Sequence, residues 1–154
     1  HDAGILTVLA PGETPGLEVE NAAGEWIGVP IVARSLVINL GEVFQSMTGN
    51  YFIATSHRVV TSSEHYSAGY FHGPSLDTML SPLDLGRRFT DAVAASPRHR
   101  SAGFMAQRNE TALGVADMSS PHHPDVYGEQ LWNYFARSYP RNMRQHYPQS
   151  RAKI

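Results

Sequence analysis

The stretch YFIATSHRVV, residues 51–60, consists largely of aromatic and β-branched residues and carries one histidine, His57. Such residues favour β-strands, in which successive side chains point to opposite faces. We therefore expect a strand over residues 51–60, with His57 on the same face as Thr55 and Val59 and with Arg58 on the other face. A structural ion pair is the expected role of Arg58 there.

Further short runs of the same kind surround this stretch and are separated by glycine, proline or polar residues. They occupy residues 4–10, 16–21, 25–32, 35–40 and 65–73. Short β-rich runs with such breaks predict a sandwich or barrel. The polar segment TSSE, residues 61–64, separates the last two runs, and we predict that it turns a hairpin in which His57 pairs near Ala68.

The pattern changes after residue 85, where apolar residues recur at helical spacing. The segment RRFTDAVAASP, residues 87–97, predicts a helix that Pro97 ends, and DVYGEQLWNYFARSYP, residues 125–140, predicts a longer one. We therefore divide the chain into a mainly β part, residues 1–85, and a helical region, residues 86–154, that packs on it.

The composition limits the classes of protein that fit. A chain of 154 residues suits one domain with a sizeable core. No run of about 18 apolar residues predicts a transmembrane helix. The absence of cysteine excludes disulfides and thiolate metal sites, and it does not by itself decide the compartment. We expect a cytoplasmic protein that does not bind membranes.

Charge is distributed unevenly along the chain. Residues 1–86 hold two basic and nine acidic residues, whereas the remainder holds ten and five. Because Arg98, Arg100 and Arg108 alternate with apolar and acidic residues, we expect a solvated helical face and not a nucleic-acid site. The expected partner is a small-molecule substrate, and the oligomeric state is left open.

Two residues carry the metal chemistry that the sequence suggests. Asp2 leads into the first predicted strand and His57 lies within a later one. Carboxylate and imidazole are ligands of hard and borderline divalent metals. Two histidines and one carboxylate on one side of a metal leave positions open for oxygen and a chelating co-substrate, which is the arrangement of non-haem iron oxygenases.

Seven segments of the chain then carry a family resemblance. In order, they are DAGILTVL, GLEV, GEWIGVP, VINLGE, TGNYFIATSHRVV, YSAGYFHGP and YGEQLWNYFARSYP. They resemble the iron(II)- and 2-oxoglutarate-dependent oxygenases of the isopenicillin N synthase-like group, whose pattern has His-x-Asp-x-Gly and later His-Arg-Val. In this chain Glu42 stands where the family has an aspartate.

The resemblance implies a mainly β fold, a double-stranded β-helix or jelly roll, with C-terminal α-helices. Residues 1–85 would then be the C-terminal part of the jelly-roll catalytic core of a larger enzyme. The implied cofactors are Fe(II), 2-oxoglutarate as co-substrate and O2, and the implied metal ligands are Asp2 and His57. The first histidine ligand would precede His1, and the rival assignment makes His1 itself that ligand.

The implied binding site for the co-substrate departs from the family at one position. The family has Arg-x-Ser where this chain has His65, Tyr66 and Ser67, so His65 and Ser67 are the candidate residues for the distal carboxylate of 2-oxoglutarate. Arginine gives a permanently charged bidentate fork, whereas histidine titrates near neutral pH. Three interpretations stay open: His65 anchors the co-substrate weakly, another cation replaces it, or 2-oxoglutarate is not used.

The reaction implied is oxidation of a C–H bond of a small molecule, with hydroxylation, desaturation or cyclisation as the outcome. One alternative is an iron oxidase of the same fold that does not need 2-oxoglutarate. A second alternative is a non-catalytic jelly-roll binding domain. The substrate itself is not readable from the sequence.

Overall fold

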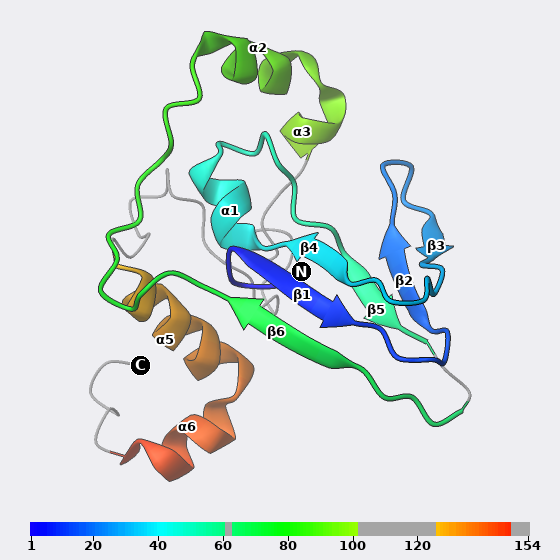
Figure 1. Ribbon diagram of the computed structural model, residues 1–154. Coiled ribbons are helices and arrows are strands. Elements are labelled where there is room, and N and C mark those ends of the chain that lie inside the picture. Colours follow the sequence, from blue (N-terminus) through cyan, green and yellow to red (C-terminus); the bar gives the residue numbers. More distant parts are fainter. Residues whose placement is uncertain (61–62, 102–125, 149–154) are drawn as a thin grey trace.

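Two antiparallel sheets of three strands form the body of the computed structural model, which describes residues 1–60, 63–101 and 126–148 (Figure 1). The first sheet has the order β4-β1-β6, with strands Val37–Leu40, Leu6–Ala10 and Ala68–His72. The second has the order β3-β2-β5, with strands Trp26–Gly28, Leu17–Glu20 and His57–Val59. After the β2-β3 hairpin, each successive strand crosses to the other sheet.

The strand register sorts side chains into an inner and an outer face. In the first sheet, Thr7 lies opposite Asn39 on β4 and Phe71 on β6. In the second sheet, Val19 lies opposite His57. All five residues line one cavity, so the two sheets face each other across it. This is the sandwich that the short strands predicted.

The strand predicted over residues 51–60 is wrong in its first part, because only His57–Val59 pairs. The preceding residues are held by other contacts. The Ala54 amide donates to Gln45 Oε1 at 2.8 Å, and the Tyr51 ring packs edge-on against Phe89 with centroids 4.7 Å apart. The aromatic residues that suggested a strand therefore pack against helices.

The predicted hairpin between residues 51–60 and 65–73 is also wrong. His57 pairs with Val19 on β2, whereas Ala68 pairs with Ala10 on β1. β5 and β6 thus lie in different sheets. The physical reason is that crossing between sheets lets the apolar inner face of each sheet cover the other, which a hairpin within one sheet would not do.

A short helix, α1 (Glu42–Met47), follows β4 and was not predicted. Its start lies close to the beginning of the chain: the Gly41 amide donates to the Ile5 carbonyl at 2.9 Å and the Glu42 amide to the Asp2 carbonyl at 2.7 Å. A Cβ atom at Gly41 would overlap the Gly4 carbonyl, so glycine permits this approach. The helix therefore fixes the backbone around Asp2.

The core next to α1 joins the β part to the C-terminal helices. Val43, Leu80 and Tyr127 are buried together, and Ile5 and Leu131 pack against them. Tyr127 and Leu131 belong to α5 (Tyr127–Ser138), which corresponds to the helix predicted over residues 125–140. α5 thus packs on the β part next to the start of β1.

The remaining described helices are α2 (Arg87–Ala95), α3 (Pro97–Ser101) and α6 (Pro140–His146). α2 ends before Pro97, as predicted, and Pro97 starts α3. None of the described helices is long and apolar enough to span a membrane.

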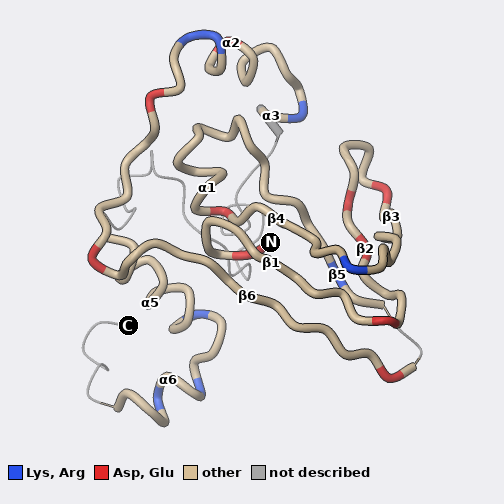
Figure 2. The backbone as a smooth tube through the Cα atoms, viewed as in Figure 1, with Lys and Arg blue, Asp and Glu red and all other residues tan. Residues whose placement is uncertain are grey.

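The described basic residues of the C-terminal part divide between two ends of the molecule (Figure 2). They lie on α2 and α3 at one end and on α5 and α6 at the other: Arg87, Arg88, Arg98, Arg137, Arg141 and Arg144. Arg108 lies outside the described residues. The absence of nucleic-acid binding stays a prediction.

Candidate active site

Asp2 and His57, the two predicted metal ligands, lie next to each other. Asp2 leads into β1 and His57 begins β5, and the Asp2 Oδ1 atom lies 3.4 Å from the His57 Nε2 atom. The His57 side chain is 27% exposed and the Asp2 side chain 12% exposed. The two side chains therefore meet at the wall of the cavity, where a small ligand can reach them.

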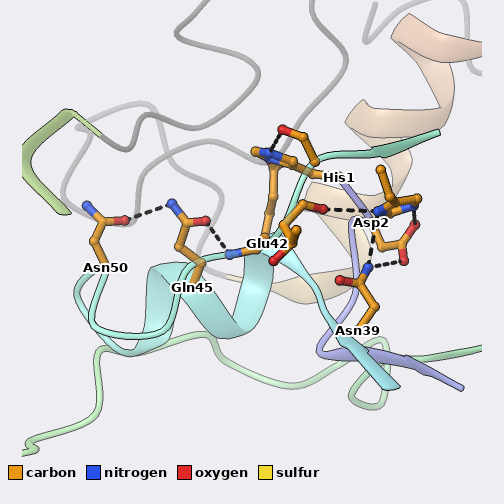
Figure 3. Close-up of polar contacts among 10 residues, drawn as sticks. His1, Asp2, Asn39, Glu42, Gln45 and Asn50 are labelled. Atoms are coloured by element: carbon orange, nitrogen blue, oxygen red, sulfur yellow. Dashed lines mark hydrogen bonds and ion pairs between the residues drawn. The ribbon is translucent and has the colours of Figure 1, made fainter. Parts of the chain in front are cut away.

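The second oxygen of Asp2 is held by two hydrogen bonds. Thr7 Oγ1 donates to Asp2 Oδ2 at 2.6 Å. Asn39 Nδ2 donates to the same atom at 2.8 Å (Figure 3). Burial raises the pKa of the Asp2 carboxyl, but hydrogen bonds from His57, Thr7 and Asn39 outweigh burial and bring this pKa well below its usual value. Asp2 is thus an oriented carboxylate with Oδ1 turned towards His57.

The His57 ring is oriented from its other side. Its Nδ1–H donates to the Thr55 carbonyl oxygen at 3.0 Å, and Nε2 faces Asp2. The hydrogen bond to Asp2 raises the pKa of His57, burial lowers it, and the net pKa lies above 6.5. A carbonyl oxygen that accepts from Nδ1–H in this way sets the tautomer that presents Nε2 to a metal.

This arrangement fits a divalent metal. Two ligand atoms bound at right angles, each about 2.1 Å from one ion, lie about 3 Å apart, which is close to the observed 3.4 Å. The second polar atom of each side chain, Asp2 Oδ2 or His57 Nδ1, is hydrogen-bonded to the protein, as is common in metal ligands. Within residues 1–60, 63–101 and 126–148, no third histidine or carboxylate completes a metal-binding group.

The cavity between the sheets has a volume of about 340 Å³ and contains all four predicted site residues. Asp2 and His57 line it together with His65 and Ser67. The Nδ1 atom of His65 is buried and has no hydrogen-bond partner within the described part of the chain. None of the described arginines or lysines lines this cavity.

A second cavity, of about 270 Å³, lies between α5 and the ends of β1 and β6. Its walls are rich in aromatic side chains, and it shares Asp2 and Phe71 with the first cavity. The other aromatic residues lining it are Tyr127, Tyr134, Phe135 and Tyr139. The sequence predicted a helix over residues 125–140, but not a cavity beside Asp2.

Two residues adjacent to the predicted ligands have other roles. The His1 ring points away from Asp2 and contacts Glu42 and Ser56. This geometry does not support the rival assignment of His1 as a metal ligand. Arg58 lies on the outer face of its sheet. Its Nε donates to Glu18 at 2.7 Å, as the predicted structural ion pair requires.

Known proteins resemble part of this chain in sequence. Residues 1–74 match the 2OG-Fe(II) oxygenase superfamily. The chain is 38% identical over 87 residues to gibberellin 3-beta-dioxygenase 3 of Arabidopsis thaliana, a match that covers 53% of this chain and 25% of that protein. It is 37% identical over 86 residues to the 2-oxoglutarate-dependent dioxygenase citB of Monascus ruber, covering 54% and 26%. The chain thus spans about a quarter of the length of these curated relatives.

The fold is shared with a solved structure along most of the chain. Neurospora crassa T7H in complex with alpha-KG and thymine superposes with a TM-score of 0.61 at 19% identity, covering 90% of this chain and 36% of that chain. This likeness confirms the predicted jelly-roll fold with C-terminal helices. The matched residues 1–74, slightly under half of the chain, are thus similar in sequence to the 2OG-Fe(II) oxygenase superfamily, and the solved structure adds a likeness of fold.

Proposed function

We propose that residues 1–154 form part of an iron(II)- and 2-oxoglutarate-dependent oxygenase that oxidises a C–H bond of a small molecule. The observation that supports this function most is the oriented pair of Asp2 and His57, 3.4 Å apart at the cavity between the sheets. The proposed outcome is hydroxylation, desaturation or cyclisation. A cytoplasmic location stays a prediction.

In this proposal Asp2 and His57 hold iron(II), and a histidine from outside the described residues is the third ligand. Iron(II), with 2-oxoglutarate and O2, supplies the oxidising power for an unactivated C–H bond. The protein orients the donors: Thr7 and Asn39 fix the Asp2 carboxylate, and the Thr55 carbonyl fixes the His57 ring.

His65 and Ser67 are proposed to bind the distal carboxylate of 2-oxoglutarate. Both line the cavity that Asp2 and His57 line, and the buried, unpaired Nδ1 atom of His65 is an available polar group. A cation from the described helical region is not supported as a replacement, because none of its described basic residues lines this cavity. The oxidase without 2-oxoglutarate remains the alternative.

The aromatic cavity beside α5 is proposed to receive the primary substrate. Its two shared wall residues, Asp2 and Phe71, bring a bound molecule next to the proposed iron site. A volume of about 270 Å³ suits a small organic molecule, and aromatic walls favour an apolar or planar one.

The test uses the full-length protein that contains residues 1–154. Anaerobic titration with Fe(II) should show about one iron bound per chain, and addition of 2-oxoglutarate and O2 should then release CO2 from 2-oxoglutarate. Iron binding with O2 consumption but no use of 2-oxoglutarate would select the oxidase. A folded protein that binds no iron would refute the oxygenase and favour the non-catalytic binding domain.

A further inference from the structure

A buried polar group that includes His1 lies behind the proposed ligands. The His1 Nδ1–H donates to Glu42 Oε1 at 2.8 Å, and the His1 Nε2 atom lies 2.8 Å from Ser56 Oγ. The side chains of His1 and Glu42 are only 4% and 1% exposed. Burying a carboxylate is costly unless it is paired, so this pairing stabilises the arrangement only while all its members remain in place.

Two members of this group directly precede the proposed metal ligands in the chain. His1 immediately precedes Asp2, and Ser56 immediately precedes His57. The hydrogen bond between His1 and Ser56 therefore joins the two residues next to the proposed ligands. It crosses from the segment that leads into β1 of one sheet to the residue just before β5 of the other.

Glu42 ties this pair to α1. It is the first residue of α1, its carboxylate accepts from His1, and its backbone amide donates to the Asp2 carbonyl oxygen at 2.7 Å. One helix start thus holds both the side chain before Asp2 and the backbone of Asp2 itself. Figure 3 shows His1, Glu42, Asp2 and Asn39 gathered at this point.

None of these three side chains lines the cavity between the sheets. Neighbouring residues in extended chain point in opposite directions, so His1 and Ser56 face away from the cavity that Asp2 and His57 face. The group can therefore act on the metal only through the positions of the two ligands. Metal sites are sensitive to such support, because ligands about 1 Å out of place bind poorly.

We infer that His1, Glu42 and Ser56 form a positioning link, which holds Asp2 and His57 at the spacing that one metal ion needs across two sheets. This inference rests on the proposed function, which places iron(II) at Asp2 and His57. It goes further by assigning roles to three residues that touch neither metal nor co-substrate.

The experiment measures Fe(II) affinity anaerobically, together with melting temperature, in the full-length protein. Glu42→Ala and Ser56→Ala should each weaken Fe(II) binding by roughly tenfold or more, as loss of hydrogen bonds that orient metal ligands typically does. Glu42→Gln keeps an acceptor oxygen of the same reach and should restore most of the affinity. The double variant should bind about as weakly as either single variant, because both changes release His1.

Thr48→Ala is the matched control. Thr48 is a buried residue that follows α1, and its hydroxyl donates to the Phe44 carbonyl, but it makes no contact with the link. This variant should lower the melting temperature without changing Fe(II) affinity. The visible absorption spectrum of bound Co(II) should likewise change in Glu42→Ala and Ser56→Ala and stay unchanged in Thr48→Ala.

Two results would overturn the inference in distinguishable ways. If the unmodified protein binds no Fe(II), the proposed function fails and the link has nothing to position. If the unmodified protein binds Fe(II) and a folded Ser56→Ala variant binds it equally well, the proposed function survives and the link is refuted. Ser56 is only partly buried, so its alanine variant remains informative even where Glu42→Ala does not fold.

Discussion

His57 Nε2 lies 3.4 Å from Asp2 Oδ1, although Asp2 leads into a strand of one sheet and His57 begins a strand of the other. No backbone ladder joins these two strands. The approach of the two side chains therefore depends on how the sheets face each other, and on the side-chain hydrogen bonds around each residue.

The first prediction concerns the metal ligands. Asp2→Ala and His57→Ala should each remove most of the bound iron from the full-length protein, because each deletes one donor atom of the site. Metal analysis of the purified, folded variants makes the measurement. His99→Ala is the control, since His99 contacts Ser96 and the Tyr51 carbonyl and should leave the iron content intact. Unaltered iron in both ligand variants would contradict the assignment.

The second prediction concerns the two residues that hold Asp2 Oδ2. Thr7→Val keeps the shape of the side chain and removes the hydroxyl, and Asn39→Ala removes the amide. Each should weaken Fe(II) binding by roughly ten- to a hundredfold, because the carboxylate loses a partner that orients it. Isothermal titration with Fe(II) under anaerobic conditions gives the affinities, and equal affinities in all three proteins would refute the role.

The third prediction concerns His65. A hydrogen bond to a charged group contributes about 1.5–3 kcal/mol, so His65→Ala should weaken 2-oxoglutarate binding by roughly ten- to a hundredfold. His65→Arg should bind 2-oxoglutarate at least as tightly as the unmodified protein, since arginine offers a permanently charged bidentate fork. The measurement is the dissociation constant of 2-oxoglutarate for the three proteins, and an unchanged constant in His65→Ala would exclude His65 as the anchor.

The fourth prediction separates Arg58 from the site next to it. Its guanidinium is paired with Glu18 and lies 4.1 Å from the centre of the Trp26 ring, with 48% of the side chain exposed. Exposed contacts of this kind are weak, so Arg58→Ala should lower the free energy of unfolding by about 1 kcal/mol or less. Iron binding should not change. Denaturant unfolding and metal analysis test both statements, and a loss of iron would place Arg58 in the site.

The sequence predicts the fold class and most strands because each strand carries a clear alternation or β-branched run. It does not predict α1, which has six residues and a glycine at its N-cap without a side-chain hydrogen bond. It does not predict α6 either, although Pro140 at the first position of this helix is a common helix start. Short helices are set by their neighbours, and periodicity over so few residues carries little information.

The candidate site was predictable to the extent that its residues carry recognisable motifs. Asp2 and His57 belong to such motifs, and the structure brings them together. The link through His1, Glu42 and Ser56 was not predictable, because its members are far apart in the sequence and meet only after the sheets have packed. The error over the β5–β6 hairpin has the same origin. The partner of each strand depends on how the whole chain packs, and the polar segment between β5 and β6 does not determine it.

The register of the first sheet determines which kinds of sequence change this site can tolerate. Thr7 and Asn39 face Asp2 because they lie directly opposite each other in paired strands. A single-residue insertion within β4 would replace Asn39 by an apolar neighbour on the inner face while leaving the hydrophobic content of the strand intact. Length changes in the surrounding loops are absorbed without such an exchange. Over evolutionary time, the site should therefore permit free variation in loop length. Within each strand, the same positions should continue to face the cavity.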